Sequence, residues 1–120
     1  MAEGYLTARA YTDADVAAAR TRRDAIRQRL DAVLAEDAVL CLPTTPAPAP
    51  RRGERTSARR DLRARITMLT CIAGTTGRPQ INLPLAEVDG LPVGLSLLGA
   101  RGADEVLLAC ARDVATRLAH

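Results

Sequence analysis

The chain has 120 residues, a formal net charge of +3 and a hydrophobic content of 48%, which together fit one globular domain. Its only aromatic residues are Tyr5 and Tyr11, so the core must be aliphatic and no stacking platform for nucleic-acid bases exists among the arginines. The three widely spaced cysteines and a single histidine, His120, cannot supply the ligands of a zinc site, so we expect no metal.

All seventeen basic residues are arginine, and lysine is missing from the sequence. No leader segment and no apolar run near about twenty residues is seen, which predicts a protein without membrane association. The cysteines form no CxxC pair, so we expect a reducing, cytoplasmic location with buried free thiols. No nucleotide-binding fingerprint is present, and we expect no cofactor.

The first predicted helix begins near Thr12, because Asp13 and Asp15 place acids in its first turn. Apolar residues recur at three- and four-residue steps as far as about Glu36, which predicts an amphipathic helix packed on a core. The short apolar run 38–42 then predicts a buried strand.

A proline- and arginine-rich connector is predicted over residues 43–60, because four prolines in its first half exclude a helix or an inner strand. A second helix is expected from about Ser57 to Ala73, ended by the glycine-containing segment 74–79.

A hairpin follows, with strands over 80–86 and 92–98 joined by an Asp-Gly turn at Asp89 and Gly90. Pro84 places the first of these strands at an edge or a bulge. A last helix begins at Asp104. Its predicted apolar face consists of Val106, Leu107, Cys110, Val114 and Leu118.

This order of elements predicts an α/β unit, α+β-like, with three helices packed on a small mixed sheet of about three strands. We expect a single domain over residues 1–120. Three strands form a poor independent sheet, so at least one sheet edge is expected to take a partner.

Five segments then carry a family resemblance. They are LCLPTTPAP at 40–48, TCIAGTTGRPQ at 70–80, INLPL at 81–85, DGLPVGLSLLG at 89–99 and DEVLL at 104–108. In this order they resemble the C-terminal segment of amidase-signature hydrolases. The resemblance implies a piece of a larger α/β fold, whose chemistry uses a serine nucleophile, a second serine in a cis peptide and a lysine base. Those groups belong to a region of the family that has no counterpart in this sequence.

The residues agree with that implication. Ser57 and Ser96 are the only serines, neither lies in a Gly/Ser-rich loop, and no lysine is present. A serine nucleophile needs an adjacent base. We therefore expect no amide hydrolysis by this chain alone, and the catalytic residues remain unassigned.

Polar residues near the PTTP bend, which in the family borders the substrate cavity, are predicted to bind substrate. The set is Thr44, Thr45, Cys71, Thr75, Thr76, Gln80 and Asn82. Each has a structural alternative: the hydroxyls satisfy loop backbone, the thiol is buried, and the glycine-rich segment at 74–77 is a tight turn rather than an anion-binding nest. The arginines between 51 and 65 either bind a carboxylate or phosphate or form a solvated face.

Three functions stay open. The first is an amidase fragment or split subunit whose partner is an N-terminal amidase chain. The second is a stand-alone homodimer that binds a small molecule or regulates a partner. The third option is a small biosynthetic enzyme of cyclase or isomerase type. Its candidate acids are Glu54, Asp61, Glu87 and Asp89.

Overall fold

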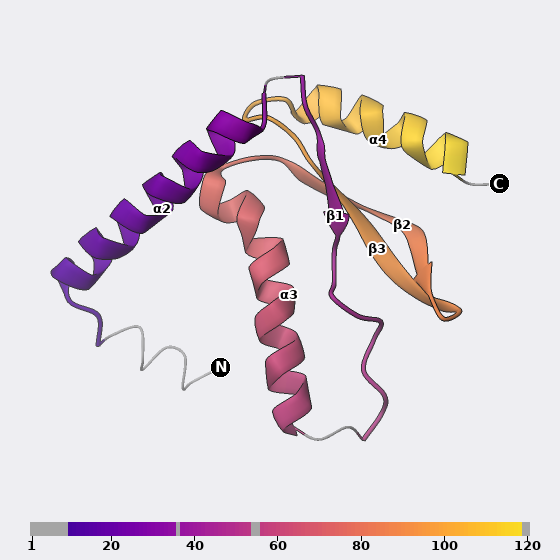
Figure 1. The fold of residues 1–120 in the computed structure, drawn as a ribbon, viewed down its shortest axis with the longest axis horizontal. Coiled ribbons are helices and arrows are strands. Elements are labelled where there is room, and N and C mark those ends of the chain that lie inside the picture. Colours follow the sequence, from indigo (N-terminus) through magenta and orange to yellow (C-terminus); the bar gives the residue numbers. More distant parts are fainter. Residues whose placement is uncertain (1–9, 36, 54–55, 119–120) are drawn as a thin grey trace.

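The computed structural model describes residues 10–35, 37–53 and 56–118, and Figure 1 shows their arrangement. The described elements are α2 (Asp13–Val33), β1 (Leu40–Pro43), α3 (Thr56–Thr76), β2 (Gln80–Val88), β3 (Leu91–Leu98) and α4 (Asp104–Leu118). The predicted fold class and order of elements are confirmed. Because α3 begins at Thr56, the connector after β1 ends before the predicted residue 60. None of the described helices combines the length and apolar character that spanning a membrane requires.

The sheet has the order β1-β3-β2 and is antiparallel throughout rather than mixed, because β3 lies between two strands that run opposite to it. Asp89 and Gly90 form the two-residue turn between β2 and β3, with φ of 52° and 75°. Positive φ at both positions is what a type I′ hairpin requires. The predicted hairpin and its turn are therefore confirmed.

The hairpin contains a bulge at the predicted place. Ala86 pairs with Val93, whereas Leu83 pairs with Leu95, so two residues of β2 stand opposite one residue of β3. Pro84 lies inside this irregularity, where its missing N–H breaks no ladder hydrogen bond. The bulge shifts the pairing of the first half of β2 by one residue, which changes the side chains that meet across the sheet.

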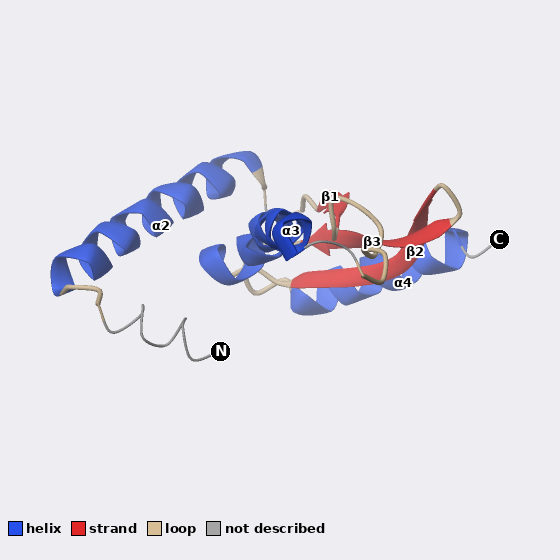
Figure 2. Ribbon diagram, turned by 90° about the horizontal axis from the view of Figure 1, so that it is seen from below, coloured by secondary structure: helices blue, strands red, loops and turns tan. Residues whose placement is uncertain are grey.

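The core lies between α4 and one face of the sheet, as Figure 2 shows. It is formed by the buried residues Leu83, Leu97, Leu107 and Ala111, with Ile81, Leu85, Cys110 and Val114 packed around them. The inward residues of α4 follow the spacing of a single helix face. The predicted face was wrong for Val106 and Leu118, which are 63% and 56% exposed. Val106 lies about 100° round the helix from the buried Leu107, and Leu118 is the last residue of α4.

Helix α2 begins as predicted. Thr12 and Asp15 form a capping box, in which each side chain accepts a hydrogen bond from the other residue's backbone N–H. The helix ends at Val33, before the predicted Glu36, and its predicted packing on a core was wrong, because no residue of α2 is buried and Val33 is 82% exposed. Of the predicted apolar face only Leu34, the residue after the helix, is buried. Figures 1 and 2 show α2 standing away from the sheet, with its last turns against α3.

Strand β1 and two of the thiols are also more open than predicted. Leu40 is 37% exposed and Cys41 is exposed, because β1 lies at the sheet edge and no described element covers it. Cys71 is exposed on α3, and only Cys110 is partly buried. The predictions of a buried strand and of buried thiols at these two positions were therefore wrong.

The described shape is flat and extended. The principal extents are 51 × 42 × 20 Å and the radius of gyration is 17.1 Å, whereas a compact domain of this length has about 13.6 Å. The accessible surface is 9407 Å², against about 6,300 Å² for a compact monomer of this size. Much of the apolar surface that the sequence provides therefore lies uncovered.

Candidate functional site

A polar cluster joins three segments that are distant in the sequence. The hydroxyl of Thr44 donates a hydrogen bond to Asn82 Oδ1 at 2.5 Å, and its oxygen lies 2.7 Å from Ser96 Oγ. A hydroxyl carries one hydrogen, so Thr44 is the donor to Asn82 and Ser96 is the donor to Thr44. The three side chains thus form a directed chain, Ser96 to Thr44 to Asn82, which we call the hydroxyl–amide chain.

The strand register explains this meeting. Leu42 and Asn82 both stand opposite Ser96, on either side of the central strand β3. Thr44 follows two residues after Leu42, so it lies on the same face, and its N–H donates to the carbonyl of Gly94 at 2.8 Å. This places the Thr44 side chain over Gly94 and next to Asn82.

Gly94 makes the cluster possible. A Cβ atom at this position would lie 2.0 Å from Asn82 Oδ1 and 2.8 Å from Thr44 Oγ1. Both distances are well inside van der Waals contact, so any side chain here would displace the hydrogen-bonded atoms. The glycine is required by this close approach rather than by its backbone conformation.

The hydroxyl–amide chain can hold and orient groups, but it has no acid–base chemistry. Ser96 is fully buried, and neither it nor Thr44 has a titratable base beside it that would make its hydroxyl a nucleophile. Asn82 is exposed, and its amide nitrogen has no hydrogen-bond acceptor among the described residues. The arrangement therefore fixes the PTTP bend to the hairpin and leaves one oriented amide donor at the surface.

Of the seven residues predicted to bind substrate, the described hydrogen bonds bring together Thr44 and Asn82. Thr45 instead donates to the carbonyl of Ala47 at 2.8 Å, inside the bend. Gln80 lies half-buried at the start of β2, opposite Leu98.

The other three predicted residues lie on α3. Cys71 is exposed, Thr75 is half-buried, and the buried Thr76 donates to the carbonyl of Ile72 at 2.7 Å. Each of these side chains lies outside the hydroxyl–amide chain. The hydrogen bond of Thr76 closes the last turn of the helix, so its hydroxyl proton is already used.

The glycine-rich segment 74–77 is not the tight turn that the sequence suggested. Helix α3 continues through Gly74 to Thr76 and ends at Gly77, which has a φ of 68°. The N–H groups of Gly77 and Arg78 both donate to the carbonyl of Ala73, at 2.8 and 3.1 Å. Backbone amides that close a helix end are not available to form an anion-binding nest.

Sequence reasoning missed Ser96 and Gly94 as members of the cluster. The available signal was their two-residue spacing, which places both on one face of a strand. That signal does not say which residue of the neighbouring strand lies opposite them, because the bulge at Pro84 sets the pairing.

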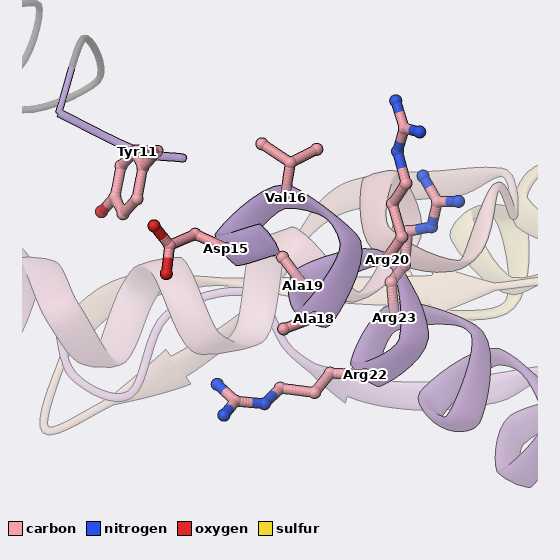
Figure 3. Close-up of a pocket in the computed structure, with 8 residues that line it drawn as sticks. All are labelled: Tyr11, Asp15, Val16, Ala18, Ala19, Arg20, Arg22 and Arg23. Carbon is pink, nitrogen blue, oxygen red and sulfur yellow. The ribbon is translucent and has the colours of Figure 1, made fainter. Parts of the chain in front are cut away.

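A hollow of about 530 Å³ lies along the first turns of α2 (Figure 3). Its arginine side chains do not converge, since Arg20 and Arg22 point in different directions. Asp15, on its wall, is engaged by Thr12, whose side-chain and backbone hydrogen bonds hold the pKa of that carboxyl below its ordinary value. This hollow is therefore an open surface along the helix, whose polar side chains do not converge on a common ligand position.

The comparisons with known proteins agree with the fold. The Amidase family model matches residues 1–108, so the chain belongs to the amidase family. Amidase 1 of Oryza sativa subsp. japonica is 38% identical over 86 residues, which are 72% of this chain and 20% of that protein. A glutamyl-tRNA(Gln) amidotransferase subunit from Thermus thermophilus is 43% identical over 107 residues, 82% of this chain and 22% of that protein.

Solved structures give the same result. A crystal structure of an amidase superposes with a TM-score of 0.81 at 35% identity, covering 97% of this chain and 28% of that one. The corresponding glutamyl-tRNA(Gln) amidotransferase subunit from Thermotoga maritima gives a TM-score of 0.72 at 30% identity, covering 93% and 24%. The chain thus spans about a fifth of the length of the curated relatives it matches.

Proposed function

We propose that this chain forms the C-terminal part of an amidase fold and contributes to amide C–N hydrolysis only together with a complementary segment. That segment supplies the two serines and the lysine that the family resemblance implies. This chain supplies an apolar surface, a sheet edge and the PTTP bend.

The uncovered surface is the observation that carries this proposal. The chain exposes 9407 Å², about 3,000 Å² more than a compact monomer of its size. Ile26, Val33 and Met68 are 49%, 82% and 75% exposed on the two helices that lie away from the core. Even an obligate homodimer covers only about 1,000–2,500 Å² per partner. A large complementary segment therefore fits this surface better than the predicted homodimer does.

The two sheet edges differ in a way that supports strand addition at β1. The free edge of β2 is protected by the bulge at Pro84 and by the exposed charge of Glu87. The first three residues of β1, Leu40-Cys41-Leu42, carry no charge, and Leu40 and Cys41 are exposed; the only proline of this strand is its last residue, Pro43. An exposed apolar edge without charge, such as Leu40 to Leu42, can pair with another strand.

In this proposal the hydroxyl–amide chain positions the PTTP bend, and Asn82 directs its amide N–H groups toward the substrate side of the bend. Thr44 then acts by holding Asn82, while its own hydroxyl hydrogen is used internally. The alternative of a small enzyme with new chemistry finds no support in the described residues. Asp61 pairs with Arg65 on the exposed face of α3, and Glu87 and Asp89 lie at the hairpin end; Glu54 lies outside the described residues.

The test is a segment replacement. The part of rice Amidase 1 that aligns with this chain is exchanged for residues 1–120, and release of ammonia from a panel of small primary amides is measured. We expect the chimera to fold and hydrolyse at least one of the amides that rice Amidase 1 itself hydrolyses, and the chain alone to hydrolyse none. Hydrolysis by the chain alone, or a chimera that unfolds while the parent stays folded, would contradict the proposal.

A further inference from the structure

Two arginines pair with a single aspartate where α2, the α3–β2 turn and the β3–α4 turn meet, and a third arginine lies nearby on α2. Asp31 Oδ1 lies 2.7 Å from Arg78 Nη2, and Asp31 Oδ2 lies 3.2 Å from Arg101 Nη2. Arg27, one helical turn before Asp31, places its Nη2 3.9 Å from the Cβ position of Gly77, the neighbour of Arg78. Both carboxylate oxygens are in use, and the four side chains carry a net charge of +2.

The buried member of this cluster is only partly satisfied. The side chain of Arg78 is 3% exposed, and its Nη1 donates to the carbonyl of Gly99 at 3.2 Å. Its Nε is buried without an acceptor among the described residues, and the Nε of Arg27 is in the same state. Buried guanidinium groups are stable when they are paired and fully hydrogen-bonded, so this cluster lacks negative charge and acceptors.

A hollow of about 290 Å³ opens at this point. Asp31, Arg78 and Arg101 line its polar side, and Leu34, Ala35 and Ala100 line the rest. A volume of this size is at the lower end of small-molecule sites, which suits an anion of few atoms. Arg101 is 50% exposed at the rim, so its remaining N–H groups are accessible from solvent.

We propose that this hollow binds a small oxyanion, a phosphate or a carboxylate, between Arg101 and Arg78. Both ligands present at least two oxygens at the spacing that a guanidinium group recognises. Arg27 adds attraction from α2 without closing the hollow. Binding would add negative charge at the junction of three segments and so stabilise the end of α2 against the α3–β2 and β3–α4 turns. The site is separate from the hydroxyl–amide chain and does not depend on amide hydrolysis.

The test measures binding of inorganic phosphate by equilibrium dialysis. The chain is carried on a soluble fusion protein, so that its apolar surface does not cause aggregation, and the carrier alone is the blank. Ionic strength is held constant with sodium chloride, because screening changes with salt. We expect saturable binding, with acetate competing if a carboxylate shares the site and failing to compete if the site is specific for phosphate. Absence of saturable binding overturns the proposal.

Two variants locate the site, and one controls for charge. Arg101→Gln is expected to weaken phosphate binding at least fivefold, and Arg27→Gln at least twofold. Arg23→Gln is the matched control, because Arg23 is 46% exposed, forms an ion pair with Asp24 at 3.3 Å, and loses the same charge. It is expected to change binding less than twofold, and circular dichroism verifies that all variants keep their helices. Equal weakening by the control, or wild-type binding by both Arg101→Gln and Arg27→Gln, overturns the proposal.

Discussion

Replacing Gly94 by alanine tests the geometry of the hydroxyl–amide chain most directly. The new Cβ would lie 2.0 Å from Asn82 Oδ1 and 2.8 Å from Thr44 Oγ1, so the Asn82 side chain must rotate away and release Thr44. Overpacking of this kind costs about 1–3 kcal/mol, and the lost hydrogen bond adds about 1 kcal/mol. Alanine is intrinsically more stable than glycine in a strand by about 0.5–1 kcal/mol, which offsets part of this loss. The net loss expected is about 2 kcal/mol in the free energy of unfolding.

The assay is urea unfolding of the rice chimera, in which the apolar surfaces are covered, monitored by circular dichroism. Gly74→Ala is the matched control, because no atom beyond the adjoining residues and the backbone of its own helix lies within 4 Å of its Cβ position, and Gly74 lies inside α3. That substitution is expected to stabilise by about 1 kcal/mol through helix propensity. Asn82→Ala in the Gly94→Ala background removes the clashing oxygen, so the two changes should cost less together than their sum. A Gly94→Ala protein as stable as the parent would refute the reasoning.

The remaining predictions concern a buried hydroxyl, a helix cap and the thiols. Ser96→Ala removes the donor to Thr44 and should lower the free energy of unfolding of the chimera by about 1–2 kcal/mol; no change would mean that this hydrogen bond does not hold the bend. The lowered pKa of Asp15 contributes stability to α2 that is complete above its ordinary value of 3.8 and is lost as the pH falls through the folded value. On acidification through this range, helical circular dichroism of the chain should therefore fall more than that of Asp15→Ala, and parallel curves would count against the capping box. Cys41 and Cys71 should react quickly with a disulfide reagent in the isolated chain and Cys110 slowly. Protection of Cys41 in the chimera is expected if a strand adds to β1, and equal reactivity in both would argue against that edge.

In the hairpin, the sequence predicted the turn but not the pairing of the two strands. Asp89 and Gly90 identify a two-residue turn, and counting back from Val88 opposite Leu91 would place Asn82 opposite Leu97. The bulge moves the pairing by one residue, so Asn82 stands opposite Ser96 instead. Pro84 signalled an irregular edge strand, but it did not say in which direction the pairing would shift. Two of the three members of the hydroxyl–amide chain, Thr44 and Asn82, were therefore predicted, and Ser96 was not.

Burial was predicted less well than local structure, and for one physical reason. The apolar period of α2 and the apolar run of β1 describe surfaces that are suited to burial, and the prediction assumed that this chain supplies the cover. In the structure Val33 and Leu40 remain 82% and 37% exposed. An amphipathic pattern states which side of an element avoids water, and it does not state which molecule excludes that water.

What the sequence determined by itself is therefore local. Caps, turn residues and hydrophobic spacing act over a few positions, and they set the order and type of the elements, from the Thr12 capping box to the Asp89-Gly90 turn. The tertiary structure alone decided which side chains meet, because one extra residue in β2 changes every partner beyond it and because contacts such as Asp31 with Arg78 join positions far apart in the chain. The close approach of Asn82 and Thr44 to Gly94 has no signature in a linear sequence, since it depends on three strands being in register at once.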